Sequence, residues 1–236
     1  EFLKECLPMI DKDLAKRLRK KMEKDGIKFN MGYSVQAIAD LKADAVLVAT
    51  GRKPNYDEEE LTRVGIEFDR RGIITDDNML TTADGIYAIG DVNGKALLAH
   101  AATFQGIRAV NHILKRHDHI RFDIMPSAVF TQPEVASVGI TEDACKTNSI
   151  AYKTHKGFYR ANGKAMAEEV TDGLAKIITG DGGRIIGCHI LGAHAADMVQ
   201  EIAALMNKDV TLSELADMIH IHPTLSEIVQ DIAING

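Results

Sequence analysis

The sequence predicts an α/β region followed, near residue 122, by an α+β domain. Two short β-branched apolar runs, at 43–50 and 85–89, each end in a glycine turn, as buried strands of an open α/β sheet do. A helical apolar pattern at 97–114 follows the second run. After residue 121 the expected strands pair locally and the helices are grouped late, which is typical of an α+β domain.

The α/β region begins with an amphipathic helix at 11–25. Leu14, Leu18 and Met22 repeat every four residues among charged side chains. Gly26 is a usual helix stop. The other elements expected in this region are a strand with an internal turn at 27–35, a strand at 43–50, a turn at 51–55, a short helix at 58–64, strands at 73–75 and 85–89, and the helix at 97–114.

The α+β domain contains a clear hairpin signal. Gly180-Asp181-Gly182-Gly183 separates two strand-like runs, at 174–179 and 184–191. The other elements expected here are strands at 128–131, 136–140 and 151–158, and helices at 195–206, 212–218 and 225–233.

Composition excludes several classes of protein. Apolar content is 45% and charged content 26%, which is ordinary for a globular protein. The net charge of -6 gives no support for a nucleic-acid partner. No apolar run reaches the roughly 18 residues of a membrane span, and the start has no signal-peptide layout, so we expect a cytoplasmic protein. Because the chain begins at Glu1 without a Met, we also expect it to be cut from a longer protein.

The cysteines indicate neither a disulfide framework nor a metal site. Cys6, Cys145 and Cys188 lie far apart, their number is odd, and no CxxC occurs. We therefore expect reduced thiols and no bound metal.

The first motif that could carry chemistry is His222-Pro223-Thr224-Leu225-Ser226-Glu227. Histidine titrates near neutral pH, and a Glu in the first turn of the next helix could fold back onto the imidazole. Such a carboxylate fixes the tautomer and makes Nε2 a stronger base. Thr224 could cap that helix. The alternative is a surface histidine beside a Glu that merely favours the helix start.

Two strand ends form the second and third motifs. Gly90-Asp91 ends the run at 85–89, and a helix begins shortly afterwards, so a ligand could meet Asp91 and the helix N-terminus. The run at 43–50 ends in Gly51-Arg52-Lys53-Pro54-Asn55. The alternative for both is a plain connection between elements.

The order of these motifs is more specific than any one of them. ATGRKPN, TTADGIYAIGD, LLAHAATFQG, PSAVFTQPEVASVGITE and HIHPTLSE follow one another along the chain. In this order they resemble the C-terminal half of the pyridine nucleotide–disulfide oxidoreductases, which include dihydrolipoamide dehydrogenase, glutathione reductase and mercuric reductase. The resemblance covers essentially the whole chain.

The resemblance implies a fold class and a domain organisation. The chain would hold the remnant of two dinucleotide-binding, Rossmann-like domains followed by an α+β interface domain. Residues 1–51 resemble the second half of the NAD domain, and residues 52–121 the segment that returns to the FAD and central regions. Residues 122–236 resemble the interface domain, through which family members form homodimers.

The resemblance also implies site residues. His222 would be the acid/base that handles thiol protons and Glu227 would orient it, and the pair would serve the flavin site of the other subunit. The expected FAD contacts are Gly90, Asp91, Ala99, His100 and Ala101, and the expected NAD contacts are Gly51, Val35 and Glu1.

The ending HIHPTLSE resembles the dihydrolipoamide dehydrogenase branch, whose partners are lipoyl domains of 2-oxoacid dehydrogenase or glycine cleavage complexes. Gln105 and Asp197 depart from the commoner pattern of that branch, and we expect neither to touch the proposed chemistry. GxGxxG is absent, and so are two cysteines five apart. The chain alone is thus expected to be inactive. The alternatives are a non-catalytic dimerisation module and a glutathione-reductase-like enzyme.

Overall fold

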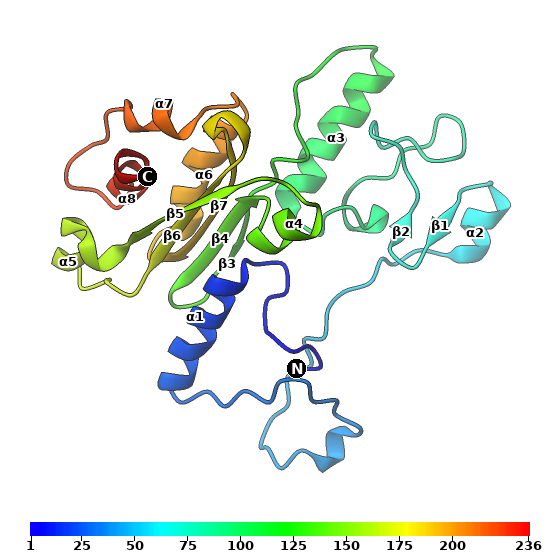
Figure 1. Ribbon diagram of the computed structural model, residues 1–236. Helices are drawn as coiled ribbons and strands as arrows, with labels where there is room; N and C mark the ends of the chain where they lie inside the picture. Colours follow the sequence, from blue (N-terminus) through cyan, green and yellow to red (C-terminus); the bar gives the residue numbers. More distant parts are fainter. The chain divides into compact units, whose positions relative to one another are not determined.

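The computed structural model describes residues 1–236 apart from the side chain of Asp40. It divides into two compact units, drawn together in Figure 1. The unit named here the sheet unit comprises Glu1–Ala37 and Asp123–Gly236. The other, the middle unit, comprises Ile38–Phe122.

The sheet unit is built on a five-stranded antiparallel sheet with strand order β3-β4-β7-β6-β5. The predicted hairpin is confirmed, because β6 and β7 pair side by side and are joined by a short turn in which Gly182 has a φ of +67°. The strands are β3 Ser127–Val129, β4 Glu134–Gly139, β5 Lys153–Phe158, β6 Leu174–Thr179 and β7 Ile185–Gly192.

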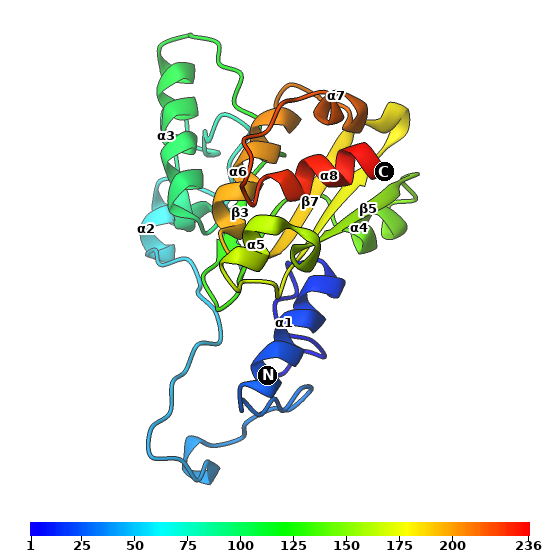
Figure 2. The ribbon, with the colours of Figure 1, turned by 90° about the vertical axis from the view of Figure 1, so that its left-hand side faces the viewer.

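Helices α6 (Ala195–Met206) and α8 (Glu227–Asn235) cover one face of this sheet (Figure 2). Their apolar side chains interleave with those of the strands, and Ile190, Ile202 and Ile228 are each no more than 1% exposed. Burial of this kind contributes about 1.5–3 kcal/mol for each large aliphatic side chain. The connecting helices are α4 Glu142–Thr147, α5 Gly163–Ala167 and α7 Leu212–Ala216, of which the sequence predicted only the last.

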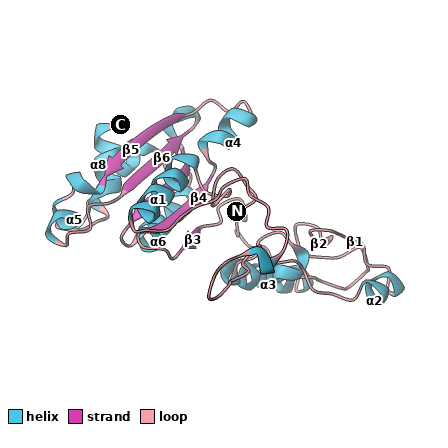
Figure 3. Cartoon of the chain, turned by 90° about the horizontal axis from the view of Figure 1, so that it is seen from below, coloured by secondary structure: helices cyan, strands magenta, loops and turns pink.

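Helix α1 (Lys12–Lys24) covers the opposite face of the sheet (Figure 3). Its predicted apolar stripe is confirmed: Leu14 and Leu18 are buried against the sheet and Met22 packs beside them. Asp11 caps the helix by accepting the N–H of Asp13. The predicted strand at 27–35 is wrong. Those residues form turns and extended chain that bond to the first residues instead, as when Gly32 N–H donates to Leu3 O at 2.9 Å.

The middle unit holds four helical segments, two short β-strands and a small apolar cluster that includes Ile66, Ile73 and Ala88. The helix predicted at 97–114 is confirmed as α3, and that at 58–64 as α2. The bounds of the elements are η1 Ile38–Asp40, α2 Glu58–Arg63, β1 Phe68–Asp69, β2 Gly72–Ile73, η2 Gly90–Asn93 and α3 Ala99–Ile113.

The two buried strands predicted for this unit are wrong. Residues 43–50 form no strand, and Leu47 and Val48 are 89% and 62% exposed. Residues 85–89 make only an isolated bridge between Tyr87 and Leu80. Both runs have the composition of strands buried between neighbours, but the described chain places no partner strand along either edge, and a lone strand leaves its backbone groups unpaired. The strand at 73–75 is partly confirmed by β2 and a bridge from Thr75 to Thr81.

Among the described residues, no helix has both the length and the apolar character required to cross a membrane.

Candidate functional site

The predicted histidine–carboxylate pair forms in the sheet unit, at the start of α8. His222 Nδ1 donates a hydrogen bond to Glu227 Oε1 at 2.9 Å. The other carboxylate oxygen, Oε2, accepts the N–H of Thr224 at 2.7 Å. The carboxylate is therefore held by two donors, and the residues between them form a closed loop.

Electrostatics keeps this carboxylate ionised. The N–H of Thr224, and after it the hydrogen bond from His222, lower the pKa of the Glu227 carboxyl below its ordinary value. An ionised carboxylate on Nδ1 fixes the imidazole tautomer, which leaves Nε2 as the nitrogen that exchanges protons. The His222 side chain is 81% exposed, so Nε2 is open to a substrate. The arrangement can accept a proton and return it.

Thr224 holds the loop in a different way from the one predicted. Helix α8 begins at Glu227 and not at Leu225, so Thr224 is not its cap. The Thr224 hydroxyl donates instead to Ile221 O at 2.7 Å. The residue contributes its backbone N–H to the carboxylate, because the tight loop turns that group inward.

A second histidine fixes the segment before His222, and the sequence did not single it out. The side chain of His220 is 7% exposed, and its Nε2 bonds Glu201 Oε1 at 2.8 Å. Its Nδ1 bonds Met218 O at 3.1 Å, and Gln230 Nε2 donates to the same carbonyl. No spacing signal points to this contact, since Glu201 lies on α6, 19 residues before His220.

In the middle unit the expected FAD contacts gather at η2 and the start of α3. Gly90 has a φ of +75°, a conformation that favours glycine, and it lies against Ala102 of α3. Its N–H donates to Gln105 Oε1 at 2.7 Å, and Asn93 Nδ2 donates to the same oxygen at 2.9 Å. Asp91, beside Gly90, is exposed.

The structure brings Gln105, one of the two departures from the commoner pattern, into contact with an expected FAD residue. Its side chain is 1% exposed and holds the backbone N–H of Gly90. It thereby sets the position of Gly90 and of Asp91. Asp197, the other departure, is an exposed residue whose carboxylate lies 3.5 Å from His194 Nδ1.

Ala99, His100 and Ala101 form the first turn of α3. N–H groups in the first turn of a helix have no carbonyl of their own helix to bond and carry the positive end of its dipole. Leu98 occupies the N-cap position and makes no side-chain cap. An apolar cap fits a site where an electron-rich group, such as the pyrimidine edge of a flavin, meets the helix end.

The expected NAD contacts divide between the two units. Glu1 and Val35 lie in the sheet unit, where Tyr33 N–H donates to Glu1 O at 3.0 Å and so brings the two segments side by side. Val35 is 47% exposed. Gly51 belongs to the middle unit, where it is exposed and has a φ of +110°.

The thiols are not poised for chemistry in the described structure. Cys145 and Cys188 are fully buried, and burial is the main cause that raises the pKa of both thiols. Burial and the neighbouring Glu5 carboxylate raise the pKa of the Cys6 thiol as well. A raised pKa keeps a thiol protonated and so a poor nucleophile.

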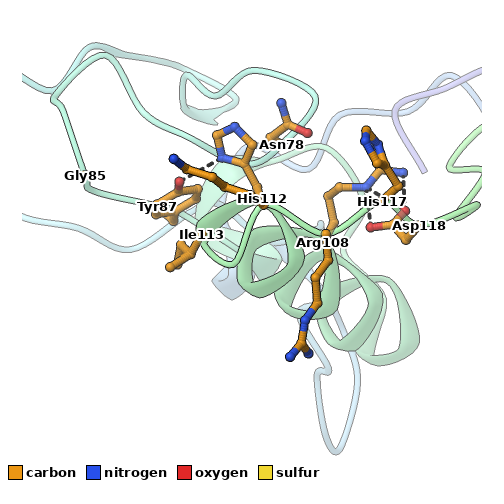
Figure 4. Close-up of a pocket in the computed structure, with 10 residues that line it drawn as sticks. Asn78, Gly85, Tyr87, Arg108, His112, Ile113, His117 and Asp118 are labelled. Atoms are coloured by element: carbon orange, nitrogen blue, oxygen red, sulfur yellow. Dashed lines mark hydrogen bonds and ion pairs between the residues drawn. The ribbon is translucent and has the colours of Figure 1, made fainter.

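A groove of about 930 Å³ lies in the middle unit at the C-terminal end of α3 (Figure 4). In it Tyr87 Oη and His112 Nδ1 share a hydrogen bond of 2.8 Å. Arg108 pairs with Asp118 at 2.9 Å and donates to Ile120 O. These groups are satisfied by one another, and none of the expected cofactor contacts lines the groove.

Two family profiles match the chain. The profile described as "Pyridine nucleotide-disulphide oxidoreductase" matches residues 1–106, and its dimerisation domain matches residues 125–233. These matches agree with the family resemblance found in the motifs.

Curated relatives with similar sequences include dihydrolipoyl dehydrogenases. That of Chlamydia muridarum is 36% identical over 249 residues, which cover 99% of this chain and 54% of the relative. That of Synechocystis is 41% identical over 207 residues, which cover 83% of this chain and 44% of the relative. The chain thus spans about half the length of the curated relatives it matches.

Solved structures with similar folds include LpdA from Mycobacterium tuberculosis, with a TM-score of 0.88 and 28% identity over 99% of this chain and 55% of that one. The copper complex of the flavoprotein disulfide reductase RclA from Escherichia coli has a TM-score of 0.87 and 25% identity over 100% of this chain and 57% of that one. These matches confirm the predicted fold class.

Proposed function

The chain belongs to the pyridine nucleotide-disulphide oxidoreductase family, and on that premise we propose that it forms the C-terminal half of a dihydrolipoyl dehydrogenase. The reaction is the oxidation of dihydrolipoyl groups with NAD⁺. The observation that carries the proposal is the hydrogen bond from His222 to Glu227, supported by curated relatives of that name.

In this proposal His222 is the acid/base for the substrate thiols. Its exposed Nε2 would take the proton from one thiol of the dihydrolipoyl group as that sulfur attacks the reactive disulfide, whose own S–S bond breaks to release a thiolate, and it would later release that proton. Glu227 holds Nδ1–H throughout and stabilises the positive charge that the ring acquires. Glu201 positions the preceding turn through His220.

Family members use FAD and NAD, and this chain carries part of a fit to each. The flavin and its hydroxyl-bearing chain would fit against Gly90, Asp91 and the first turn of α3. The sequence has no GxGxxG motif, the loop that would bind a pyrophosphate. When bound, FAD supplies the carrier that passes a hydride to NAD⁺. The reactive disulfide and both phosphate loops would come from the part of the relatives that this chain does not cover.

The proposal includes a homodimer formed through residues 122–236, because the dimerisation-domain profile lies there. Ile219 and Ile221 beside the site are 99% and 79% exposed, as expected for side chains that a second subunit covers. We also include lipoyl domains as the macromolecular partner and the cytoplasm as the location.

The test restores the missing half. The N-terminal segment of the Chlamydia muridarum relative, up to the point where the match begins, is fused ahead of Glu1. The fusion should bind FAD and oxidise dihydrolipoamide with NAD⁺. His222→Gln in that fusion should lower kcat by roughly 10²–10⁴-fold, the usual contribution of a positioned acid/base. The matched control is His194→Gln, since His194 is also exposed and also faces a carboxylate through Nδ1. Full activity in His222→Gln would overturn the proposal.

The second candidate is a non-catalytic dimerisation module, which is favoured by the absence of GxGxxG and of two cysteines five apart. It predicts that the fusion dimerises but stays inactive. A glutathione-reductase-like enzyme would instead reduce glutathione disulfide in the same fusion and leave dihydrolipoamide untouched. The chain by itself should bind no stoichiometric flavin. If the protein remains yellow after incubation with FAD and gel filtration, the proposal that this chain carries only part of the FAD site is contradicted.

A further inference from the structure

Two rows of side chains cross the sheet on the face that α1 covers. One row is apolar and carries one residue from each strand, in register: Val129, Val135, Leu191, Leu174 and Phe158. The other row is polar and is offset from the apolar row by two residues on each strand. It consists of Ser127, Ser137, His189, Lys176 and Lys156. Leu14 and Leu18 of α1 pack against the apolar row, together with Ile10, which precedes the helix cap Asp11.

The centre of the polar row is a buried lysine. Lys176 is 0% exposed, and its Nζ lies 2.7 Å from Asp11 Oδ1, 2.6 Å from Glu142 Oε2 and 3.1 Å from Asp13 Oδ2. The ammonium donates hydrogen bonds to Asp11 and Glu142, and Asp13 completes the cluster as an ion pair. The ammonium thus takes the place that a metal ion could hold among these three acids.

The three carboxylates come from two helix starts that are far apart in sequence. Asp11 is the cap of α1, and its second oxygen accepts the N–H of Glu142 at 3.2 Å, at the start of α4. Asp11 and Lys176 are 165 residues apart and belong to segments matched by different family profiles. One ammonium therefore joins α1, α4 and the sheet.

Apolar packing and this ion cluster constrain α1 differently. Contacts with the apolar row are non-directional and would tolerate a shift of α1 along the sheet or a rotation about its axis. Hydrogen bonds of 2.6–2.7 Å from a buried ammonium, with an ion pair at 3.1 Å beside them, do not tolerate such a shift. We propose that Lys176 is a positioning residue that fixes the register of α1 on the sheet through Asp11, Asp13 and Glu142.

Its functional consequence concerns the segments at the two ends of α1. Residues 1–3 and 30–33 pair with each other, since Glu1 O accepts from Tyr33 N–H and Leu3 O from Gly32 N–H. Glu1 and Val35, the expected NAD contacts of this unit, are therefore carried by α1. Lys176 sets their position relative to the domain that bears His222. This consequence, unlike the fixed register itself, rests on the proposed function.

Several charged groups surround the cluster and bear on its response to pH. Lys156 reaches Asp13 Oδ2 at 2.8 Å, and Tyr152 Oη donates to Glu142 Oε1 at 3.2 Å. Two further ion pairs lie around these: Lys146 with Glu142 at 3.7 Å, and Lys12 with Asp143 at 2.6 Å. The histidine of the polar row, His189, is buried, and its Nδ1 has no partner among the described residues. Burial lowers the pKa of this histidine.

The carboxylates respond to acid. The Lys156 ammonium, with Lys176, lowers the pKa of the Asp13 carboxyl to about 2. Burial raises the pKa of the Asp11 carboxyl, but the hydrogen bonds from Lys176 and from the N–H of Glu142 outweigh it, so its pKa lies below the ordinary value. A depressed carboxyl pKa stabilises the folded state above about pH 4 and loses that effect as the pH falls through the folded value. Burial lowers the pKa of Lys176, but the hydrogen bonds to the carboxylates raise it by more, so the pKa lies above its ordinary value. The stability that Lys176 contributes is therefore lost only at a pH above that ordinary value.

The test is hydrogen–deuterium exchange on this chain, expressed as protection factors at pH 7 and pH 3. Lys176→Met keeps the length of the side chain and removes its charge. We expect α1 amides to lose at least tenfold protection at pH 7, while β7 and α6 amides stay within threefold. In the wild-type chain, acid should reduce protection of α1 more than that of β7, and Lys176→Met should abolish this difference. Lys164→Met, at a lysine whose side chain is 38% exposed and also pairs with a carboxylate, is the control and should change neither.

Unchanged α1 protection in Lys176→Met would overturn the proposal, and so would an equal loss in α1 and β7. If Lys176→Met fails to fold, Asp13→Asn decides the question, because that side chain is 44% exposed and the substitution removes one ion-pair partner from the ammonium. It should lower α1 protection alone, by a smaller factor, and no loss there would overturn the proposal. Exchange involves neither flavin nor NAD⁺, so its outcome is independent of whether the fusion enzyme is active.

Discussion

Residues 38–122 and residues 123–236 have similar apolar content, but only the second region forms an extended sheet. In Asp123–Gly236 the strands pair into one sheet, and Ile177 and Ile190 are fully buried. In Ile38–Phe122 the apolar runs at 43–50 and 85–89 remain largely exposed. The difference is in the source of the partners. An antiparallel sheet built from neighbouring segments completes itself, whereas strands of a parallel sheet require other strands brought from elsewhere by crossovers.

The largest expected effect tests this contrast in the cores. Ile190→Ala should lower the free energy of unfolding by about 2–5 kcal/mol, since it leaves a cavity in a fully buried site. Ile86→Ala, at a 41% exposed residue of the middle unit, should change it by less than about 0.5 kcal/mol. Urea unfolding followed by circular dichroism measures both. Equal losses would show that the run at 85–89 is packed after all.

The next effect concerns which exposed apolar residues face a second subunit. Ile219→Asp should weaken self-association at least tenfold, because it buries a carboxylate in the interface proposed for residues 122–236. Ile107→Asp, at a 43% exposed residue of α3, should leave it unchanged. Sedimentation velocity across micromolar concentrations measures the association. A wild-type chain that stays monomeric would remove the proposed interface.

A smaller effect tests the hydrogen bonds that the buried Gln105 accepts in the middle unit. Gln105→Leu removes the acceptor of the Gly90 N–H and of Asn93, and a buried donor left unpaired costs about 1–3 kcal/mol. Amide exchange of Gly90 and of α3 should accelerate accordingly, while strands of the sheet unit keep their protection. Gln36→Leu, at an exposed glutamine, is the control. Unaltered exchange at Gly90 would argue that Gln105 does not hold it.

The smallest effect compares equivalent helix caps. Thr141 caps α4 in the sheet unit, and Asp57 caps α2 in the middle unit, each through one backbone N–H. Thr141→Ala should lower the stability of the main unfolding transition by about 1 kcal/mol. Asp57→Ala should fray α2 without moving that transition, since the two helices belong to different units. A common shift in both variants would indicate that the units unfold together.

Sequence reasoning succeeded where partners are close along the chain. The hairpin of β6 and β7, the stripe of α1 and the contact of His222 with Glu227 each depend on residues separated by a turn or by one helical repeat. Their geometry follows from local periodicity and turn chemistry.

It failed where partners are distant. Glu201 with His220, Gln105 with Gly90 and Asp11 with Lys176 are 19, 15 and 165 residues apart, and no spacing rule joins them. The predicted strands at 43–50 and 85–89 failed for a related reason, because composition reports that a run suits a buried sheet but not whether neighbouring strands are present.

The exposed run Ala45–Ala49 also has a kinetic consequence. Val46, Leu47 and Val48 are uncharged, β-prone and presented as extended chain with open backbone groups. Such a segment is a template for pairing between molecules, and this reaction is second order in protein whereas docking onto a covalently attached partner strand is first order. Precipitation of this chain should therefore rise steeply with concentration, and a strand supplied on the same polypeptide would suppress it by closing the edge first.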